Sequence, residues 1–245
     1  MSENISPTSK KRAAIIIMKR ELKSYFTAPV AYIVTGLFLL ITGFVFYSTF
    51  FLYDRAELRR FFALLPIMLS FVIPALTMRI FAEERRVGSI ETLMTLPVTE
   101  VDVVAGKYLA SFLSTLIMLA PTLLYIIPVE IFGSPDYGPI VGGFIGSIFL
   151  SAAFTAIGVF ATSITKNQIV AFFTGAIICI VLAGMDRFLV LLPGPVANFL
   201  NLISAGEHFT SISRGILDTR DLLYFISLTA LFLTATVKVQ KNAKL

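Results

Sequence analysis

Six long apolar stretches, separated by shorter polar segments, dominate the chain. They cover residues 29–52, 61–80, 104–128, 138–162, 168–190 and 221–238. Each has about the 20 mostly apolar residues that an α-helix needs to cross the hydrocarbon core of a bilayer. The pattern therefore predicts an all-α polytopic membrane protein with six transmembrane helices. An even number of spans places both termini on the same side of the membrane.

The composition agrees with a membrane-embedded chain. Hydrophobic residues make up 57% of the 245 residues and charged residues only 14%, whereas ordinary soluble domains are about 25% charged. The single cysteine, Cys179, lies inside an apolar stretch and has no partner for a disulfide within the chain, so we expect it to face lipid or the core. No cleavable signal peptide is expected, because the first apolar run is too long and lacks a small-residue cleavage site.

The distribution of basic residues predicts the orientation. Fourteen of the 20 lysines and arginines fall on the side of the termini, in segments 10–23, 79–107, 166 and 238–244. Cytoplasmic segments of membrane proteins carry an excess of Lys and Arg. Both termini and the 83–97 segment are therefore predicted to face the cytoplasm. No nucleic-acid partner is expected from the net charge of +5, because the basic residues are explained by this topology.

The first 28 residues divide into two parts. Residues 1–10 are polar and are expected to form a disordered tail. Residues 11–28 predict an amphipathic helix in the membrane interface, with its basic residues near anionic head groups. The apolar positions that recur at helical spacing are Ile15, Met18, Leu22, Tyr25 and Phe26. The alternative is a plain basic flank that only fixes the topology.

The fourth span carries a face of small residues. Small side chains let helix backbones approach closely in lipid, where packing drives helix association. This face predicts a helix contact, either within the chain or with a second subunit, and packing within the chain is the simpler alternative. Its members are Gly142, Gly146, Ser147, Ser151, Thr155, Gly158 and Thr162.

The longest external connection precedes the last span. We expect residues 191–220 to form a helical insertion with re-entrant helices in the outer membrane face, because as a free loop they would expose a large apolar patch. Asp218 and Asp221 suit the start of the sixth helix. The insertion either closes the outer end of a pathway or is an interfacial cover without a gating role. With five spans in 29–190 and the sixth span and tail in 221–245, the whole chain forms a single transmembrane domain.

The sequence carries no recognisable catalytic or metal-binding constellation. His208 is the only histidine, and a lone histidine rarely makes a metal site. Gly106-Lys107 lacks the other residues of a phosphate-binding loop, so the chain is not expected to bind or hydrolyse ATP. Charged residues deep in the spans are nearly absent, which argues against an ion-coupled carrier. We therefore expect neither an enzyme nor bound cofactors in this chain.

The stretch EERRVGSIETLMTLP, residues 83–97, interrupts this apolar pattern between the second and third spans. Arg79 and Glu83 stand four residues apart, close enough to pair on a helix. Gly88 allows a break, Ser89 can cap a new helix, and Pro97 stops it. Thr99 is then predicted to cap the next helix, with Asp102 at the capping-box position. A two-turn helix is marginal alone, so its apolar stripe needs a surface to bury against.

These residues resemble a known family. Phe-Ala-Glu-Glu-Arg-Arg-x-Gly-Ser-Ile-Glu-Thr-Leu-Met-Thr-Leu-Pro-Val, followed by Gly-Lys at 106–107, is similar to the signature of ABC-2-type exporter permeases. The phrases RELKSYFTAPVAYIV at 20–34 and PALTMRIFAEERR resemble the gliding-motility-associated GldF-like branch of that family. The resemblance implies a multi-pass protein of the bacterial cytoplasmic (inner) membrane.

In that family the segment is a coupling helix that docks into a groove of a cytoplasmic ATPase. The resemblance implies that Ile90, Leu93, Met94 and Leu96 form the docking face here. It implies a polar rim of Glu83, Glu84, Arg85 and Glu91, with Gly88 and Pro97 as hinges around the cap at Ser89. It also implies that separate ABC ATPase subunits, which carry ATP and Mg, pair with two permease protomers in a homo- or heterodimer.

Two functions follow from this resemblance. The first is a permease subunit, in the direction of export, that couples ATP hydrolysis by separate ATPases to the movement of an amphipathic, lipid-like or peptide-like cargo. The alternative is a mechanotransmission component that moves no cargo and drives an envelope partner. The GldF-like branch further implies a second membrane protein with a large external domain.

Overall fold

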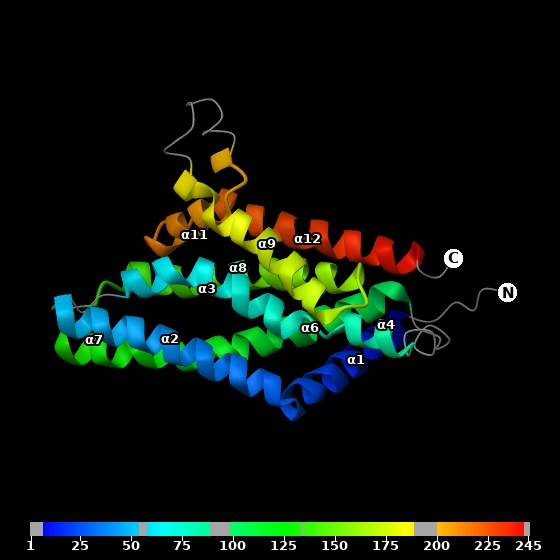
Figure 1. The fold of residues 1–245 in the computed structure, drawn as a ribbon. Coiled ribbons are helices and arrows are strands. Elements are labelled where there is room, and N and C mark those ends of the chain that lie inside the picture. The colour runs from blue at the N-terminus through cyan, green and yellow to red at the C-terminus, as the bar shows by residue number, and fades with distance from the viewer. Residues whose placement is uncertain (1–6, 54–57, 89–98, 134, 189–199, 243–245) are drawn as a thin grey trace.

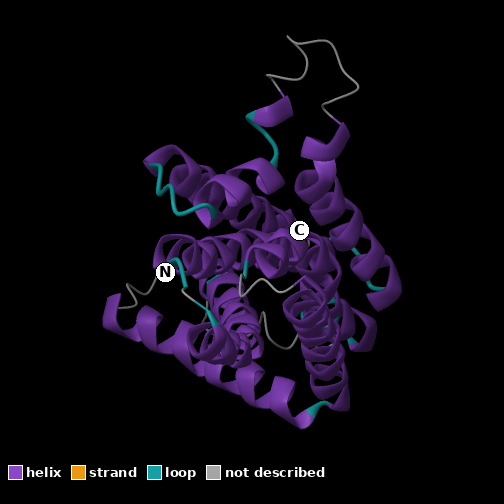
Figure 2. Ribbon diagram, turned by 90° about the vertical axis from the view of Figure 1, so that its left-hand side faces the viewer, coloured by secondary structure: helices purple, strands orange, loops and turns teal. Residues whose placement is uncertain are grey.

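The computed structural model describes residues 7–53, 58–88, 99–133, 135–188 and 200–242. These residues form helices and loops, and no strand occurs among them (Figures 1 and 2). The helices are α1 (Pro7–Thr27), α2 (Pro29–Tyr53), α3 (Arg59–Thr77), α4 (Ala82–Val87), α6 (Glu100–Leu119), the 3₁₀ helix η1 (Ala120–Tyr125), α7 (Ile126–Phe132), α8 (Tyr137–Ser163), α9 (Gln168–Phe188), α11 (Ala205–Ser213) and α12 (Thr219–Asn242).

Six helical segments are long and apolar enough to cross a membrane, which confirms the predicted all-α polytopic fold. They are Pro29–Phe50, Arg59–Arg86, Glu100–Phe132, Tyr137–Ser163, Gln168–Arg187 and Thr219–Asn242. The start of α1 and the end of α12 lie at the same end of the bundle, together with α4 (Figure 1). We call this the terminal end. α7 and α11 lie at the opposite end, from which Figure 2 views the molecule.

Helix α8 is the centre of the bundle. It packs against α3, α6, α9, α11 and α12, and its small-residue face lies buried within the chain. The packing is close enough that a Cβ atom on Gly143 would lie 2.5 Å from the Phe62 ring, and one on Gly158 would meet the Thr77 hydroxyl. The face therefore serves packing within the chain, the simpler of the two alternatives that the sequence left open.

The third span changes its helix type around Pro121. The α-helix α6 gives way at Ala120 to the 3₁₀ helix η1, with the proline in its first turn, and α7 resumes at Ile126. Proline lacks the N–H that an α-helix interior needs, and its ring clashes with the preceding turn. The span is thus one continuous helical segment with a change of helix type near its middle.

Two apolar clusters hold the bundle together. The larger one fills the bundle with side chains of α3, α8 and α9, and it includes Cys179, which is fully buried in the core. A smaller one lies at the terminal end and joins α1, the α3–α4 turn, α6 and α8, with α12 packed against it. Its buried members are Ile17, Ile80, Phe81, Val103, Val104 and Val159.

Helix α1 packs directly on α6. A Cβ atom on Gly106 would lie 2.8 Å from the Ala14 carbonyl oxygen and 2.9 Å from Ile17 Cβ, so only glycine allows the two helices to cross this closely. Ile17 is buried at this crossing, whereas Ile15, from the predicted apolar stripe, is 46% exposed. α1 begins at Pro7, earlier than the expected residue 11, and proline is well suited to the first turn of a helix.

The described part of the 191–220 insertion contains the short helix α11, packed on α8 and α9. A Cβ on Gly206 would meet the Ala183 carbonyl oxygen, so α11 lies close against α9. His208 of α11 contacts α12: its Nδ1 is 2.6 Å from Asp221 Oδ1, and its ring stacks on Tyr224 at 4.2 Å. Residues 191–199 of the insertion lie outside the described residues.

Candidate coupling site

The predicted site falls partly within the described structure. Glu83, Glu84, Arg85 and Gly88 lie on or directly after α4, at the terminal end of the bundle (Figure 1). The remaining predicted residues lie outside the described residues: Ser89, Ile90, Glu91, Leu93, Met94, Leu96 and Pro97. The described structure therefore gives the two flanks of the 89–98 segment, the end of α4 and the start of α6.

Both flanks end as their local sequence predicts. Gly88 closes α4 with φ of 76°, a left-handed conformation that glycine adopts without strain. On the other side Thr99 caps α6, and its hydroxyl accepts a hydrogen bond from Asp102 N while the Asp102 carboxylate accepts one from Thr99 N. This is the predicted capping box, with Asp in place of the usual Glu or Gln.

The centre of the site is a buried lysine. Lys107 of α6 has no exposed side-chain surface. Its ammonium donates to Glu84 Oε1 at 2.8 Å, to Glu21 Oε1 at 3.3 Å and to the Ile80 carbonyl oxygen at 2.9 Å. It also lies 5.0 Å from the centre of the Phe81 ring. A buried charge is tolerated when it is paired and its hydrogen bonds are satisfied, and all three ammonium protons have an acceptor here.

Arg20 of α1 contacts the same two glutamates as Lys107, from the solvent-exposed side. Its guanidinium lies 2.8 Å from Glu21 and 3.4 Å from Glu84, so two cations face two carboxylates. The hydrogen bond to Glu21, followed by the negative charges of Glu21 and Glu84, raises the pKa of Arg20 above its ordinary value. We call Arg20, Glu21, Glu84 and Lys107 the ion network. It joins α1, α4 and α6.

Two further contacts fix α4. Glu83 pairs with Arg79 through two hydrogen bonds of 2.8 and 3.1 Å, as the four-residue spacing predicts. Arg85 donates to the side chain of Gln240, near the end of α12, at 3.3 Å. Glu83 thus holds α4 to the α3–α4 turn, Glu84 holds it to α1 and α6, and Arg85 holds it to α12.

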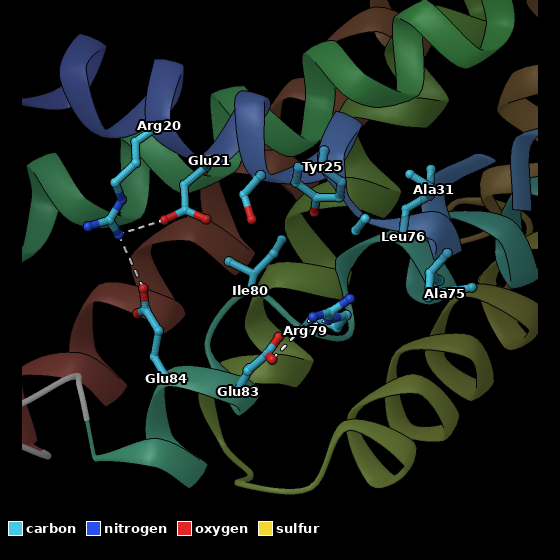
Figure 3. A pocket seen from close by; sticks show the side chains of 13 residues that line it. Arg20, Glu21, Tyr25, Ala31, Ala75, Leu76, Arg79, Ile80, Glu83 and Glu84 are labelled. Carbon is cyan, nitrogen blue, oxygen red and sulfur yellow. Dashed lines mark hydrogen bonds and ion pairs between the residues drawn. The ribbon is translucent and has the colours of Figure 1, made fainter. Parts of the chain in front are cut away.

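A cavity of about 340 Å³ opens beside the ion network. α1 and the start of α2 form one wall, and the end of α3, the following turn and α4 form the other (Figure 3). Arg20, Glu21, Arg79, Glu83 and Glu84 line its polar part. Tyr25 also lines it. Burial raises the pKa of this phenol above its ordinary value, and its hydroxyl lies 3.3 Å from Ser111 Oγ.

The sequence alone predicts only part of the ion network. The resemblance implies that Glu84 belongs to a polar rim, and in the structure its carboxylate is 18% exposed and pairs with Lys107. Lys107 was noted only as part of the Gly-Lys pair, and Arg20 only as a basic residue of α1. The available signal was a lysine inside the first turn of the predicted third span (104–128), where a charge needs a partner. In the described residues, no group of three or more His, Cys, Asp or Glu could hold a metal ion.

Comparison with known proteins decides the family. The model of the ABC-2 family transporter proteins matches residues 15–243, nearly the entire chain. The chain belongs to the ABC-2 family. As an ABC-2 permease it is the membrane component of a transporter and not the catalytic subunit. A search of curated proteins gives no match.

Family membership gives the ion network a context. ABC-2 permeases in general work with ATPase subunits and as dimers, and the six spans make this one a multi-pass membrane protein. The network of this permease lies at the base of the segment that the sequence resemblance identifies with ATPase docking. Its geometry ties both flanks of that segment to one another.

Proposed function

We propose that this permease couples ATP hydrolysis on separate ABC ATPase subunits to export across the membrane, through residues 83–97. The observation that carries the proposal is the 2.8 Å ion pair between Glu84 and Lys107. Glu84 precedes the 89–98 segment and Lys107 follows it, so the pair closes the base of the segment. ATP and Mg are bound by the partner ATPase in this proposal.

The ion pair allows a displacement of the segment to be transmitted to the membrane helices. Without the ion pair, a displacement of residues 89–98 could be absorbed by bending at Gly88 or at the start of α6. With the pair in place, displacement of the segment moves α4 and α6 together. Glu21 and Arg20 extend the same link to α1, and Arg85 extends it to α12. Motions at the segment thereby reach four elements of the membrane bundle.

The proposal includes an orientation and an assembly. The terminal end faces the cytoplasm of a bacterial cell, in the cytoplasmic (inner) membrane, which the excess of Lys and Arg there supports. Two permease protomers, alike or different, pair with two ATPase subunits. The phrases at 20–34 and 74–86 support assignment to the GldF-like, gliding-motility-associated branch, and with it a partner membrane protein that has a large external domain.

The docking role is tested by charge substitutions on the apolar stripe. Leu93→Asp and Met94→Asp are expected to abolish copurification of the ATPase, or to uncouple ATP turnover from transport, because a carboxylate would be buried in an apolar groove. The matched control is Ile216→Asp, at an exposed isoleucine shortly after α11. Unchanged copurification and coupled turnover in both variants would show that the ATPase docks elsewhere.

Export and force transmission are separated by a second measurement. A lipid-like or peptide-like cargo fits a bundle whose described spans keep their charges near the ends. If reconstituted vesicles containing both subunits move such a cargo with ATP, the protein is an exporter. If ATP turnover instead depends on an added envelope partner and no cargo moves, the mechanotransmission function is the correct one.

A further inference from the structure

The cavity beside the ion network combines features that a transport role does not by itself require. One part is polar, with the guanidinium groups of Arg20 and Arg79 and three carboxylates. The other part is apolar and is formed by Ala28, Val30, Ala31, Ala75 and Leu76. Its volume of about 340 Å³ lies in the range of small-molecule sites, about 300–1,000 Å³. It is therefore suited to an amphipathic ligand with a small polar head.

The charges in the polar part of the cavity determine which polar head of a ligand fits there. Arg79 uses Nε and Nη2 for its pair with Glu83, which leaves Nη1 for a ligand. Arg20 uses Nη2 for both of its carboxylate contacts. Each guanidinium can thus bind a phosphate without losing its protein partner. A purely anionic head would, however, lie beside the carboxylates of Glu21, Glu83 and Glu84.

A head group with both charges resolves this conflict. Its phosphate would contact Arg79, while its ammonium would lie near the carboxylates, so that opposite charges meet on both sides. The side chains of Arg79 and Glu83 are 39% and 38% exposed, so a ligand can reach this pair. The phosphate and ammonium of a phosphoethanolamine head supply this combination in one small group.

The apolar part points to a lipid as the source of that head. It lies at the bend between α1 and α2, where the chain turns from a basic amphipathic helix into the first span (Figures 1 and 3). Beyond the bend α2 presents exposed apolar side chains, including Tyr32, Ile33 and Leu37. Acyl chains that leave the cavity would continue along this surface.

We propose that the cavity between the α1–α2 bend and the end of α3 binds the head group of a zwitterionic phospholipid, such as phosphatidylethanolamine. Arg79 contacts its phosphate, and Glu83 with Glu21 contacts its ammonium. Bound there, the lipid links α1 and α2 to the α3–α4 turn, directly beside Glu84. The site needs only the membrane subunit, so its test is independent of ATPase docking and of the proposed direction of transport.

The test uses the full-length chain purified in detergent and titrated with single lipids under native mass spectrometry. We expect phosphatidylethanolamine to bind about tenfold more tightly than phosphatidylglycerol, and glycerophosphoethanolamine, which lacks chains, to bind more weakly than either. The double variant Arg79→Gln with Glu83→Gln, which keeps the net charge, removes the preference. Ala31→Phe, which fills the cavity without touching a charge, weakens the binding of the whole lipid.

The matched control is Arg187→Gln, an exposed arginine in the last turn of α9, which is expected to leave the lipid preference unchanged. Thermal unfolding of each variant verifies that it is folded. Equal affinity for the two lipids, or an unchanged preference in the folded double variant, would overturn the proposal. Glycerophosphoethanolamine binding as tightly as the lipid would overturn the assignment to a membrane lipid.

Discussion

Lys107 is the central residue of the ion network. It is fully buried, and its ammonium is shared between carboxylates that come from α1 and α4. Removing one member of a buried ion pair leaves the other charge without compensation, at a cost of about 3–5 kcal/mol. Lys107→Met keeps the aliphatic length and removes the charge, so we expect a lower midpoint of thermal unfolding for the purified chain in detergent.

The control for this substitution is Lys19→Met, at an exposed lysine of α1, which should change the midpoint little. Adding Glu84→Gln to Lys107→Met should recover part of the loss, because Glu21 alone can still pair with Arg20. A midpoint for Lys107→Met equal to that of the Lys19 control would mean that the ion network does not stabilise the fold.

Single residues also show what the sequence could and could not predict. Gly88, Thr99 and the Arg79–Glu83 pair were predicted correctly because each depends on neighbours within four residues. The partners of Lys107 could not be predicted in this way. Glu84 and Glu21 are distant from Lys107 in sequence. Glu21 meets it because α1 crosses α6 at Gly106, and Glu84 meets it because α4 lies beside α6. At the edge of a span, the hydropathy pattern does not distinguish a buried, paired lysine from an exposed lysine that only sets the topology.

At the scale of elements, the crossing of α1 and α6 positions the network. Gly106→Ala would place a Cβ against the Ala14 carbonyl oxygen and Ile17 Cβ, and backbone oxygen cannot move aside as a flexible side chain can. Overpacking of this kind costs about 1–3 kcal/mol. We expect a lower unfolding midpoint and faster proteolysis within α1. Gly36→Ala on α2, where a Cβ would have nothing within 4 Å, is the control and should not destabilise.

If Gly106→Ala matched Gly36→Ala in both measurements, α1 would not be held at this crossing.

The same crossing explains the difference between the predicted and observed faces of α1. Spacing selected a stripe through Ile15, but Ile17 is the residue that packs on the glycine. Helical periodicity indicates that one face is apolar, whereas the exact side that is buried depends on the shape of the neighbouring helix. The six spans, in contrast, follow from hydropathy alone.

At the scale of the whole molecule, α12 connects the two ends of the bundle. Its 24 residues span about 36 Å at 1.5 Å per residue. Near its start Asp221 holds His208 of α11, and near its end Gln240 accepts a hydrogen bond from Arg85 of α4. α4 and α11 are therefore linked through one rigid helix. For the 191–220 insertion, this link favours the alternative in which it closes a pathway over that of a passive cover.

The last prediction tests this link in the complex with the ATPase. A cysteine is placed at Leu202, which is 69% exposed in the insertion, in a background where Cys179 is replaced by alanine. If displacement of α4 moves α12 and with it α11, the labelling rate should change about fivefold or more between nucleotide-free and nucleotide-bound complexes, the lower end of typical coupling between sites. His208→Ala in the same background removes the contact with Asp221 and should reduce that change. A labelling rate that does not change with nucleotide, with or without His208→Ala, would contradict the closure, and the insertion would then serve only to cover the ends of the spans.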